Sequence, residues 1–184
     1  MNYLAIVNYY MTDTITLREP SAQDEKLFIS TMNNSQEFHF PFITAPKTTE
    51  EFASYLEKSK KESEHYFIAY SSDNKIIGVF NVSGMMQGVF KSAYLGYYAS
   101  VDFAGKGLMS KSLKLVLKEI FITLDLHRIE ANIQPTNTAS IHLVTKNGFL
   151  KEGFSPRYLK VNGIWQDHFR FALTLEDWLA NQQI

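Results

Sequence analysis

A glycine-containing turn directly before a long amphipathic helix is the segment of this sequence with the clearest chemical meaning. It follows a strand-like run over residues 92–100 and reads Ala104-Gly105-Lys106-Gly107-Leu108-Met109. The first backbone N–H groups of a helix lack partners and carry a partial positive charge, so a pyrophosphate bound there receives several hydrogen bonds. Glycine lets the backbone approach such a ligand closely. Taken alone, the two glycines fit a plain turn into a helix equally well.

The sequence lacks the other common signatures of nucleotide and metal sites. It has neither a G-x-x-x-x-G-K-[ST] loop nor a G-x-G-x-x-G finger. We expect no metal site, because no HExxH or similar ligand spacing occurs among the five histidines, His39, His65, His127, His142 and His168. Asp167 and His168 are adjacent on a predicted strand and point to opposite faces, so they do not form an acid–base pair. We interpret Asp167 as a brace of its hairpin.

Runs of alternating apolar residues predict the strands of the domain. We expect strands over residues 14–18, 65–70, 75–82, 92–100 and 128–134. Residues 158–161 and 164–173 predict a hairpin, because the Asn162-Gly163 pair between them suits a type I′ turn.

Capping signals and helical spacing predict the helices. Apolar residues at i, i+4 and i+7 over residues 109–124 form the clearest helix. The other predicted helices begin at Ser21 and end near residues 33–34, begin at Thr48 and end near residue 64, run from Asn137 to Gly148, and begin at Thr174. Residues 35–48 lack a clear period and are predicted to be a loop. Their aromatic side chains suit a substrate wall or packing onto the core equally well.

Composition limits the classes of function. The chain has 184 residues, with 18 basic and 19 acidic side chains, so no strong field attracts nucleic acid or an anionic membrane. The sequence contains no run of about 18 apolar residues, so no membrane span is predicted. The absence of cysteine excludes disulfides, thiolate metal sites and an acyl-cysteine intermediate, and it suits a cytoplasmic setting. We expect an N-terminal extension over residues 1–12 and one domain over residues 13–180.

Several motifs in a fixed order resemble the Gcn5-related N-acetyltransferase (GNAT) superfamily. They are Leu95-Gly96-Tyr97, Gly105-Lys106-Gly107-Leu108-Met109, Arg128-Ile129-Glu130-Ala131-Asn132, Pro135-x-Asn137-x-x-Ser140 and Asn147-Gly148-Phe149. The C-terminal motifs resemble the ribosomal-protein-alanine members of its Rim branch, the ribosomal-protein N-terminal acetyltransferases. These motifs include Lys151-Glu152-Gly153-Phe154, the run from Tyr158 to His168, and Glu176-Asp177-Trp178. The resemblance spans about residues 14–178.

This resemblance implies an α+β fold with a mixed central sheet flanked by helices. Its fourth and fifth strands, residues 93–100 and 128–134, splay apart and leave backbone groups for the coenzyme arm. The resemblance implies acetyl-CoA as cofactor, bound by Tyr97, Tyr98, Ala99, Ala104, Gly105, Lys106, Gly107, Leu108, Met109, Ser110, Asn137 and Ser140. The usual Gln or Arg at the first position of the turn is Ala104 here. We expect this difference to weaken coenzyme binding modestly at most, because backbone amides provide most of the binding.

The resemblance also implies direct acetyl transfer to a primary amine in a ternary complex. Many members use a tyrosine acid at the position of Val144, whereas the Rim branch uses the serine that corresponds to Ser140. Ser140 would donate a hydrogen bond to the departing thiolate, although a plain first-turn serine of a helix is the alternative interpretation. Asn137 caps that helix, contacts the coenzyme, or does both.

The proton acceptor stays open at the level of sequence. Rim-type members often carry Glu or Asp directly before Tyr158, where this chain has Arg157, and an arginine cannot accept a proton at neutral pH. Water held by backbone carbonyls, Tyr97 or Glu130 is one route. Binding of an amine that is already neutral is the other.

The acceptor is predicted to be the N-terminal α-amine of a protein, such as a ribosomal protein. An α-amine has a pKa of about 7.7 to 8.0 and needs a weaker base than lysine, near 10.4. Glu37, His39 and Phe40 lie in the loop expected on the substrate side. The alternatives are a small amine acceptor, such as a polyamine, amino sugar or drug, and an acyl-CoA-binding module without turnover. We expect a monomer or weak homodimer.

Overall fold

A computed structural model describes residues 10–12 and 15–182 of the chain. Over these residues its centre is an eight-stranded sheet with the order β1-β2-β3-β4-β5-β6-β8-β7. The strands are β1 (Tyr10–Thr12), β2 (Ile15–Arg18), β3 (Glu64–Ser71), β4 (Ile76–Met86), β5 (Ser92–Ala99), β6 (Arg128–Ile133), β7 (Leu150–Val161) and β8 (Ile164–Thr174). All neighbouring strands in this order are antiparallel except β5 and β6, which run parallel. The predicted mixed sheet is confirmed.

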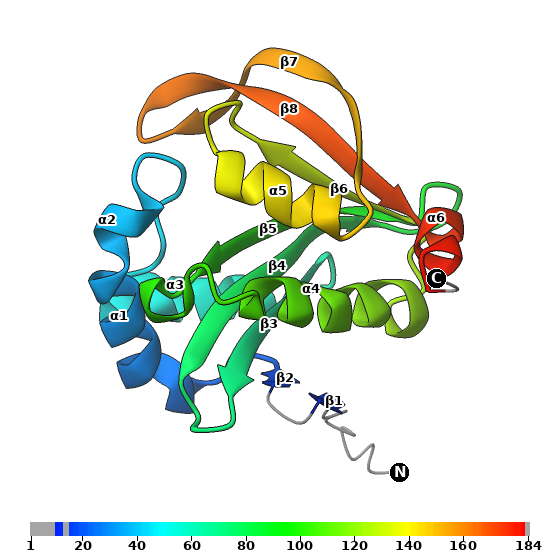
Figure 1. The fold of residues 1–184 in the computed structure, drawn as a ribbon. Helices are drawn as coiled ribbons and strands as arrows, with labels where there is room; N and C mark the ends of the chain where they lie inside the picture. The colour runs from blue at the N-terminus through cyan, green and yellow to red at the C-terminus, as the bar shows by residue number, and fades with distance from the viewer. Residues whose placement is uncertain (1–9, 13–14, 183–184) are drawn as a thin grey trace.

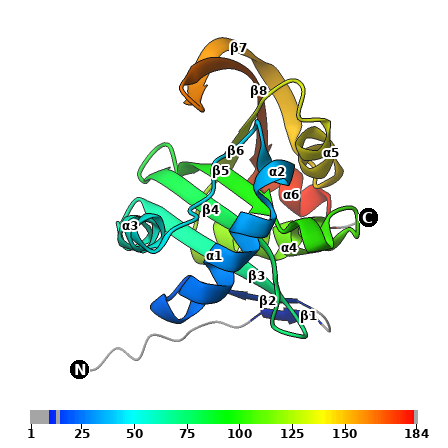
Figure 2. The ribbon, with the colours of Figure 1, turned by 90° about the vertical axis from the view of Figure 1, so that its left-hand side faces the viewer.

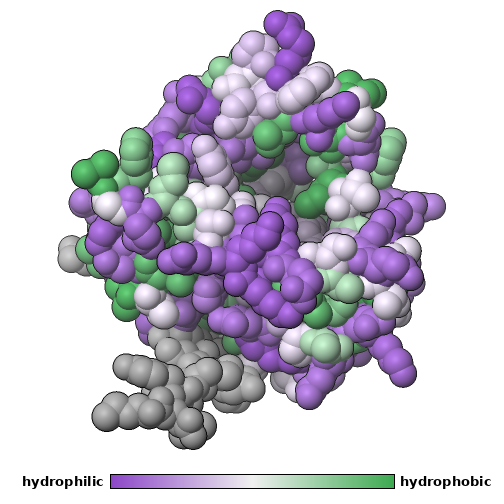
Figure 3. Space-filling model, turned by 180° about the vertical axis from the view of Figure 1, so that it is seen from behind, coloured by the Kyte–Doolittle hydropathy of each residue, from purple (hydrophilic) through white to green (hydrophobic). Residues whose placement is uncertain are grey.

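Helices cover both faces of the sheet. They are α1 (Glu25–Asn34), α2 (Gln36–His39), α3 (Thr49–Ser59), α4 (Leu108–Lys118), α5 (Thr138–Lys146) and α6 (Leu175–Ala180). Figure 2 shows α1 and α3 on one side of the sheet and α4 and α5 on the other. Each side has its own buried apolar cluster, with Phe28 and Phe52 in one and Leu117 and Val144 in the other. Hydrophilic residues cover most of the side opposite to the view of Figure 1 (Figure 3).

The parallel pair of strands is joined at one end only. Ser92, Ala93 and Tyr94 of β5 pair with Arg128, Ile129 and Glu130 of β6, and the pairing stops there. Beyond Tyr94, β5 continues along β4 to Ala99, while β6 continues along β8 to Ile133. Figure 1 shows the two strands diverging toward the side on which α2 lies. The predicted splay between these strands is confirmed.

The helix after the glycine turn follows its sequence pattern closely. Leu113, Val116 and Leu117 are buried against the sheet, and α4 continues into a π-helical turn, Glu119–Thr123. Local caps also form as the sequence predicts. Asn137 accepts a hydrogen bond from the Ser140 N–H at 3.1 Å, and Thr48 accepts one from the Glu51 N–H at 3.2 Å.

The hairpin of β7 and β8 is longer than its sequence pattern predicts. β7 begins at Leu150, because an edge strand tolerates the glycine and proline that obscure its pattern. At its tip Asn162 and Gly163 both have positive φ, as a type I′ turn requires. The side chain of Asp167 accepts a hydrogen bond from the Arg157 N–H at 2.7 Å. Asp167 therefore braces the hairpin, as interpreted from the sequence.

Three shorter segments also differ from the expectation. α2 is a four-residue helix inside the predicted loop 35–48, too short to show a helical period. α3 ends at Ser59 rather than near residue 64, because Glu64 pairs with Ser83 in the sheet. β1 lies within the predicted extension over residues 1–12 and pairs with β2. Residues 1–9 of that extension lie outside the described part of the chain.

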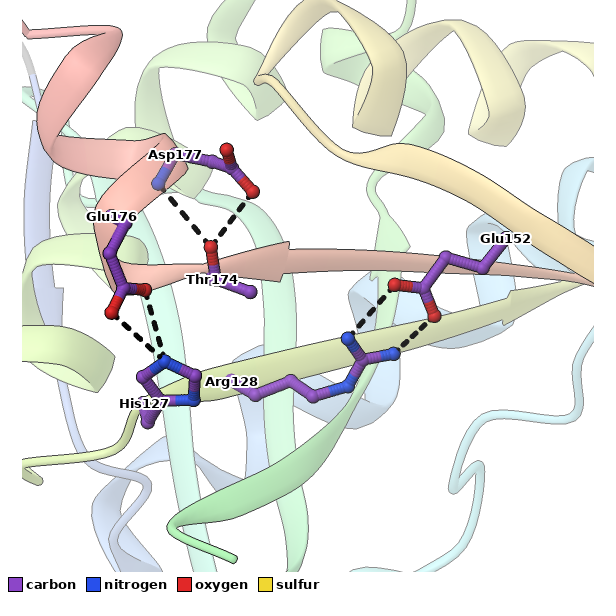
Figure 4. A network of polar contacts seen from close by, with 6 residues as sticks. All are labelled: His127, Arg128, Glu152, Thr174, Glu176 and Asp177. Carbon is purple, nitrogen blue, oxygen red and sulfur yellow. Dashed lines mark hydrogen bonds and ion pairs between the residues drawn. The ribbon is translucent and has the colours of Figure 1, made fainter.

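Polar contacts tie together the strands at the closed end of the splay (Figure 4). Arg128 on β6 donates to Glu130 through Nε at 2.8 Å and to Glu152 on β7 through Nη1 at 2.9 Å. His127, just before β6, contacts Glu176 of α6 at 3.0 Å. These contacts hold β6, β7 and α6 as one unit, while no such link joins β5 to β6 beyond Tyr94 in the described part of the chain.

Replacing Leu117 tests the core under α4. Its side chain is 1% exposed, so Leu117→Ala is expected to lower the free energy of unfolding by about 2–5 kcal/mol through lost burial and a cavity. Urea denaturation followed by circular dichroism measures this. The matched control is Lys114→Ala on the exposed side of α4, expected to change stability by less than about 0.5 kcal/mol. Equal losses in both variants would contradict this packing.

Candidate active site

A cleft of about 430 Å³ lies at the open end of the splay. Three groups of predicted coenzyme-binding residues line it. They are Tyr97, Tyr98 and Ala99 of β5, then Ala104, Gly105, Gly107, Met109 and Ser110 of the turn and α4, and Asn137 and Ser140 at the start of α5. The structure thus brings together segments from three elements. Lys106 and Leu108 belong to the turn but do not line the cleft.

The turn before α4 has the geometry of an anion site. Gly105 and Gly107 have φ of +72° and +75°, a backbone region that favours glycine, and Gly107 is the N-cap of α4. Apart from the two chain neighbours of each glycine, no atom lies within 4 Å of where its Cβ would stand. The start of α4 is therefore open to a ligand. Lys106 turns back and donates to the Asp102 carbonyl at 2.7 Å.

Ser110, in the first turn of α4, is held by a residue from α5's end. Asn147 Nδ2 donates to Ser110 Oγ at 3.0 Å and to the Leu143 carbonyl at 2.7 Å. The carbonyl can only accept, which fixes the orientation of the amide. Ser110 Oγ accepts, so its own proton is free for an anion. Sequence reasoning used Asn147 only as part of a motif and missed this contact, which joins residues far apart in the chain.

The open edge of β5 supplies unpaired backbone groups. The Ser100 N–H donates to the Ile77 carbonyl of β4 at 2.9 Å. Backbone groups alternate along a strand, so those of Ala99 and Tyr97 face away from β4, into the splay. The Ala99 carbonyl confirms this direction, since it accepts from His39 Nε2 at 2.8 Å. An extended ligand arm can pair with this edge as a strand would.

Two hydroxyl groups meet across the splay. Tyr97 Oη and Ser140 Oγ are 2.5 Å apart, and either can be the donor. Tyr97 Oη also lies 3.3 Å from the Ser140 carbonyl. Burial raises the pKa of Tyr97 well above its usual value, while the contact with Ser140 acts in the opposite direction. The pair therefore keeps both protons at neutral pH and can donate one.

The predicted substrate residues are only partly brought together. His39 lines the cleft and is 5% exposed, whereas Glu37 and Phe40 are exposed and do not line it. Their place is taken by Phe38, Phe42 and Ile43, which sequence reasoning missed. Helix α2 gives Phe38 and His39 this position, and its four residues carried no periodic signal.

The tip of the β7–β8 hairpin reaches the loop that follows α2. Asn162 Nδ2 donates to the Pro41 carbonyl at 3.0 Å, and Thr44 Oγ1 donates to Asn162 Oδ1 at 2.7 Å. Phe42 and Ile43, between these two contacts, line the cleft. A side chain at the turn of the hairpin thus fixes one wall of the cleft.

Glu130, predicted as a candidate for the proton path, lies elsewhere. It pairs with Tyr94 in register at the closed end of the splay and forms an ion pair with Arg128 at 2.8 Å. It does not line the cleft. The structure places Arg157 in the β7 strand with a φ of +48°, and it does not line the cleft either. Neither residue is brought together with Ser140.

Residues 14–150 match the acetyltransferase (GNAT) domain. This match covers most of the chain and includes β5, the turn before α4, and Ser140. The chain belongs to the GNAT acetyltransferase family.

Curated relatives agree with this assignment. The chain is 34% identical to the probable N-acetyltransferase YjcK of Bacillus subtilis, over 74% of this chain and 76% of that protein. It is 42% identical to the ribosomal protein uS5-alanine N-acetyltransferase of Escherichia coli, over 65% of this chain and 62% of that enzyme.

Solved structures share the fold of this acetyltransferase. Mycobacterium smegmatis RimJ in complex with CoA-disulfide superposes with a TM-score of 0.82 at 26% identity, covering 89% of this chain and 83% of RimJ. Spermidine N-acetyltransferase from Vibrio cholerae, in complex with CoA and spermine, has a TM-score of 0.78 at 22% identity, over 91% of this chain and 99% of that protein. At 22% identity, the similarity to the spermidine N-acetyltransferase shows the fold alone.

Acetyl-CoA is the cofactor of this GNAT acetyltransferase, and the residues of the cleft fit it. The open glycine turn and the Ser110 hydroxyl suit its pyrophosphate, and the unpaired edge of β5 suits the amides of its pantetheine arm.

The described residues contain no group of three or more His, Asp or Glu side chains that could hold a metal ion. No helix in the described ranges is long and apolar enough to cross a bilayer.

Removing the Ser110 hydroxyl tests the anion site. A hydrogen bond to a charged group contributes about 1.5–3 kcal/mol, so Ser110→Ala is expected to weaken CoA binding about tenfold or more. Isothermal titration calorimetry measures the Kd. Ser112→Ala on the same helix is the control, because the Ser112 hydroxyl is buried without a partner in the described structure and its removal should leave the Kd unchanged. An unaltered Kd in Ser110→Ala would exclude this contact.

Proposed function

We propose that this acetyltransferase acetylates the N-terminal α-amine of a protein, with a ribosomal protein as the acceptor class. The observation that carries this proposal is the composition of the acceptor end of the cleft. Phe38, Phe42 and Ile43 line it, and no Asp or Glu is among the described lining residues. A polyamine carries several positive charges and needs carboxylates nearby, whereas a single α-amine with a small apolar side chain suits an apolar wall.

The name of the Escherichia coli relative supports the same acceptor class. That enzyme is a ribosomal protein uS5-alanine N-acetyltransferase, and it shares 42% identity with this chain over the aligned residues. An α-amine also loses its proton more easily than a lysine side chain, since its pKa of about 7.7 to 8.0 lies closer to neutral pH. A cleft without a carboxylate base favours the more acidic ammonium.

The residues of the cleft divide the work of transfer. Bound acetyl-CoA supplies a thioester whose carbonyl carbon the amine attacks. The glycine turn and Ser110 would hold the phosphates, and the edge of β5 would align the arm in the cleft that Tyr97 and Ser140 line. When Tyr97 donates to Ser140 Oγ, the Ser140 proton is free to neutralise the sulfur as the carbon–sulfur bond breaks.

A panel of acceptors tests the proposed function. The purified chain is mixed with acetyl-CoA and, separately, a lysine-free peptide with a free N-terminal alanine, an N-terminally blocked peptide with an internal lysine, and spermidine. We expect thiol release, and a mass increase of one acetyl group, with the first peptide by a wide margin. Preference for spermidine or lysine would contradict the acceptor class. Thiol release with none of them, despite CoA binding, would point to a binding module.

Replacing Ser140 tests the proton donor. Ser140→Ala is expected to lower kcat by about 10²-fold, the range for loss of a general acid, with little change in the KM for acetyl-CoA. Tyr97→Phe should lower kcat as well, and the double variant should lose less than the product of the two single effects because the hydroxyls act as a pair. Thr138→Ala, exposed on the same helix, is the control. Unchanged turnover in Ser140→Ala would remove Ser140 from the mechanism.

A further inference from the structure

We propose that His39 is the general base that takes a proton from the acceptor ammonium group. The inference rests on the proposed acetyl transfer to an amine and assigns the proton acceptor of that same site. His39 of α2 packs against Tyr98, whose ring faces one side of the sheet. Ser140 meets Tyr97, whose ring faces the other side, and both His39 and Ser140 line the same cleft. A proton can therefore leave the amine on one side of the sheet while another reaches the sulfur on the other.

The contact with β5 fixes the tautomer of His39. Its Nε2 lies 2.8 Å from the Ala99 carbonyl oxygen, which can only accept, so Nε2 carries the hydrogen. In a neutral imidazole the other nitrogen, Nδ1, then holds the lone pair. Nδ1 has no hydrogen-bond partner among the residues that the structure describes. It is the nitrogen available to a bound amine.

The surroundings of His39 keep the ring neutral. Burial lowers the pKa of His39, and the hydrogen bond to Ala99 acts in the opposite direction with a smaller effect. The groups that face it are the Phe38 ring of α2, the Tyr98 ring of β5 at 5.7 Å, and the Ala99 carbonyl. Burial raises the pKa of Tyr98, so this neighbour stays uncharged. Glu37, the carboxylate on the same helix, is exposed and does not line the cleft.

The other titratable groups of the cleft are poor acceptors for this proton. Tyr97 and Tyr98 hold their own protons, and Lys146 is an ammonium with donors only. His142 is exposed and precedes Leu143, whose carbonyl is bound by Asn147 beside Ser110. His142 therefore lies at the phosphate end of the cleft. His39 remains as the base near the apolar acceptor end.

The step balances in atoms and charge. His39 Nδ1 takes one of the three ammonium protons, which leaves a lone pair on the amine nitrogen. That nitrogen forms a bond to the thioester carbonyl carbon, and the bond from this carbon to sulfur breaks. The sulfur receives a proton from the Ser140 and Tyr97 hydroxyl pair, and the second proton that the nitrogen loses restores this pair. The imidazolium of His39 then releases its proton to water, so one proton is set free for each amide formed.

A glutamine at position 39 separates a base from a structural donor. In His39→Gln the amide N–H can still donate to the Ala99 carbonyl, but the side chain cannot take up a proton at neutral pH. We expect its kcat/KM at pH 7 to be about 10²-fold below that of the wild type. The gap should close as the pH passes about 8, because the α-amine then loses its proton unaided. His168→Gln, which removes a buried histidine outside the cleft, is the control and should keep the wild-type pH profile.

The outcomes distinguish this inference from the proposed function. A loss in His39→Gln that is the same at every pH, or no loss at all, would overturn the role of His39 while leaving acetyl transfer intact. If the wild type released no thiol with any of the amines tested, this would instead overturn the proposed function. Nitrogen-15 NMR of the histidine rings gives a readout without turnover. We expect a neutral His39 with hydrogen on Nε2 at pH 7, and a charged ring or hydrogen on Nδ1 would exclude the base.

Discussion

The divergence of β5 and β6 after three paired residues is the constraint on which the rest of the site depends. Two parallel strands that stayed together would satisfy each other's backbone groups and leave no room between them. Here β6 follows β8 and β5 follows β4, so the sheet opens without losing its hydrophobic support on either face. The contacts of Arg128 with Glu130 and Glu152 hold the closed end. The open end can then expose the edge of β5 without destabilising the sheet.

Alternation along β5 distributes the chemistry over two faces. Tyr97 packs with the cluster under α4 and α5, and Tyr98 packs with the cluster under α1 and α3. The hydroxyl of Ser140 therefore meets Tyr97 on one side, while His39 meets Tyr98 on the other. The strand itself separates a donor side from an acceptor side. The donor and the proposed base therefore reach the same cleft from opposite faces of the sheet.

The sequence predicted most of the features that depend on local residue patterns and motifs. The splayed strands, the glycine turn and the caps at Thr48 and Asn137 follow from periodicity, capping and family motifs, and the structure contains them. Helix α2 could not be predicted, because four residues are too few to show a period, and the contact between Asn147 and Ser110 depends on the packing of two helices. The position of Glu130 also depends on tertiary pairing, since its ion pair with Arg128 lies at the closed end of the splay, away from the cleft.

The bridge from Asn162 to Pro41 and Thr44 carries a consequence for the engineering of this chain. It joins the turn of the last hairpin to a loop that lies more than a hundred residues earlier. Lengthening either partner by even one residue would move Asn162 away from its two contacts. The hairpin and the loop must therefore vary in length together, and a chimera that imports a foreign loop after α2 has to import the matching hairpin with it.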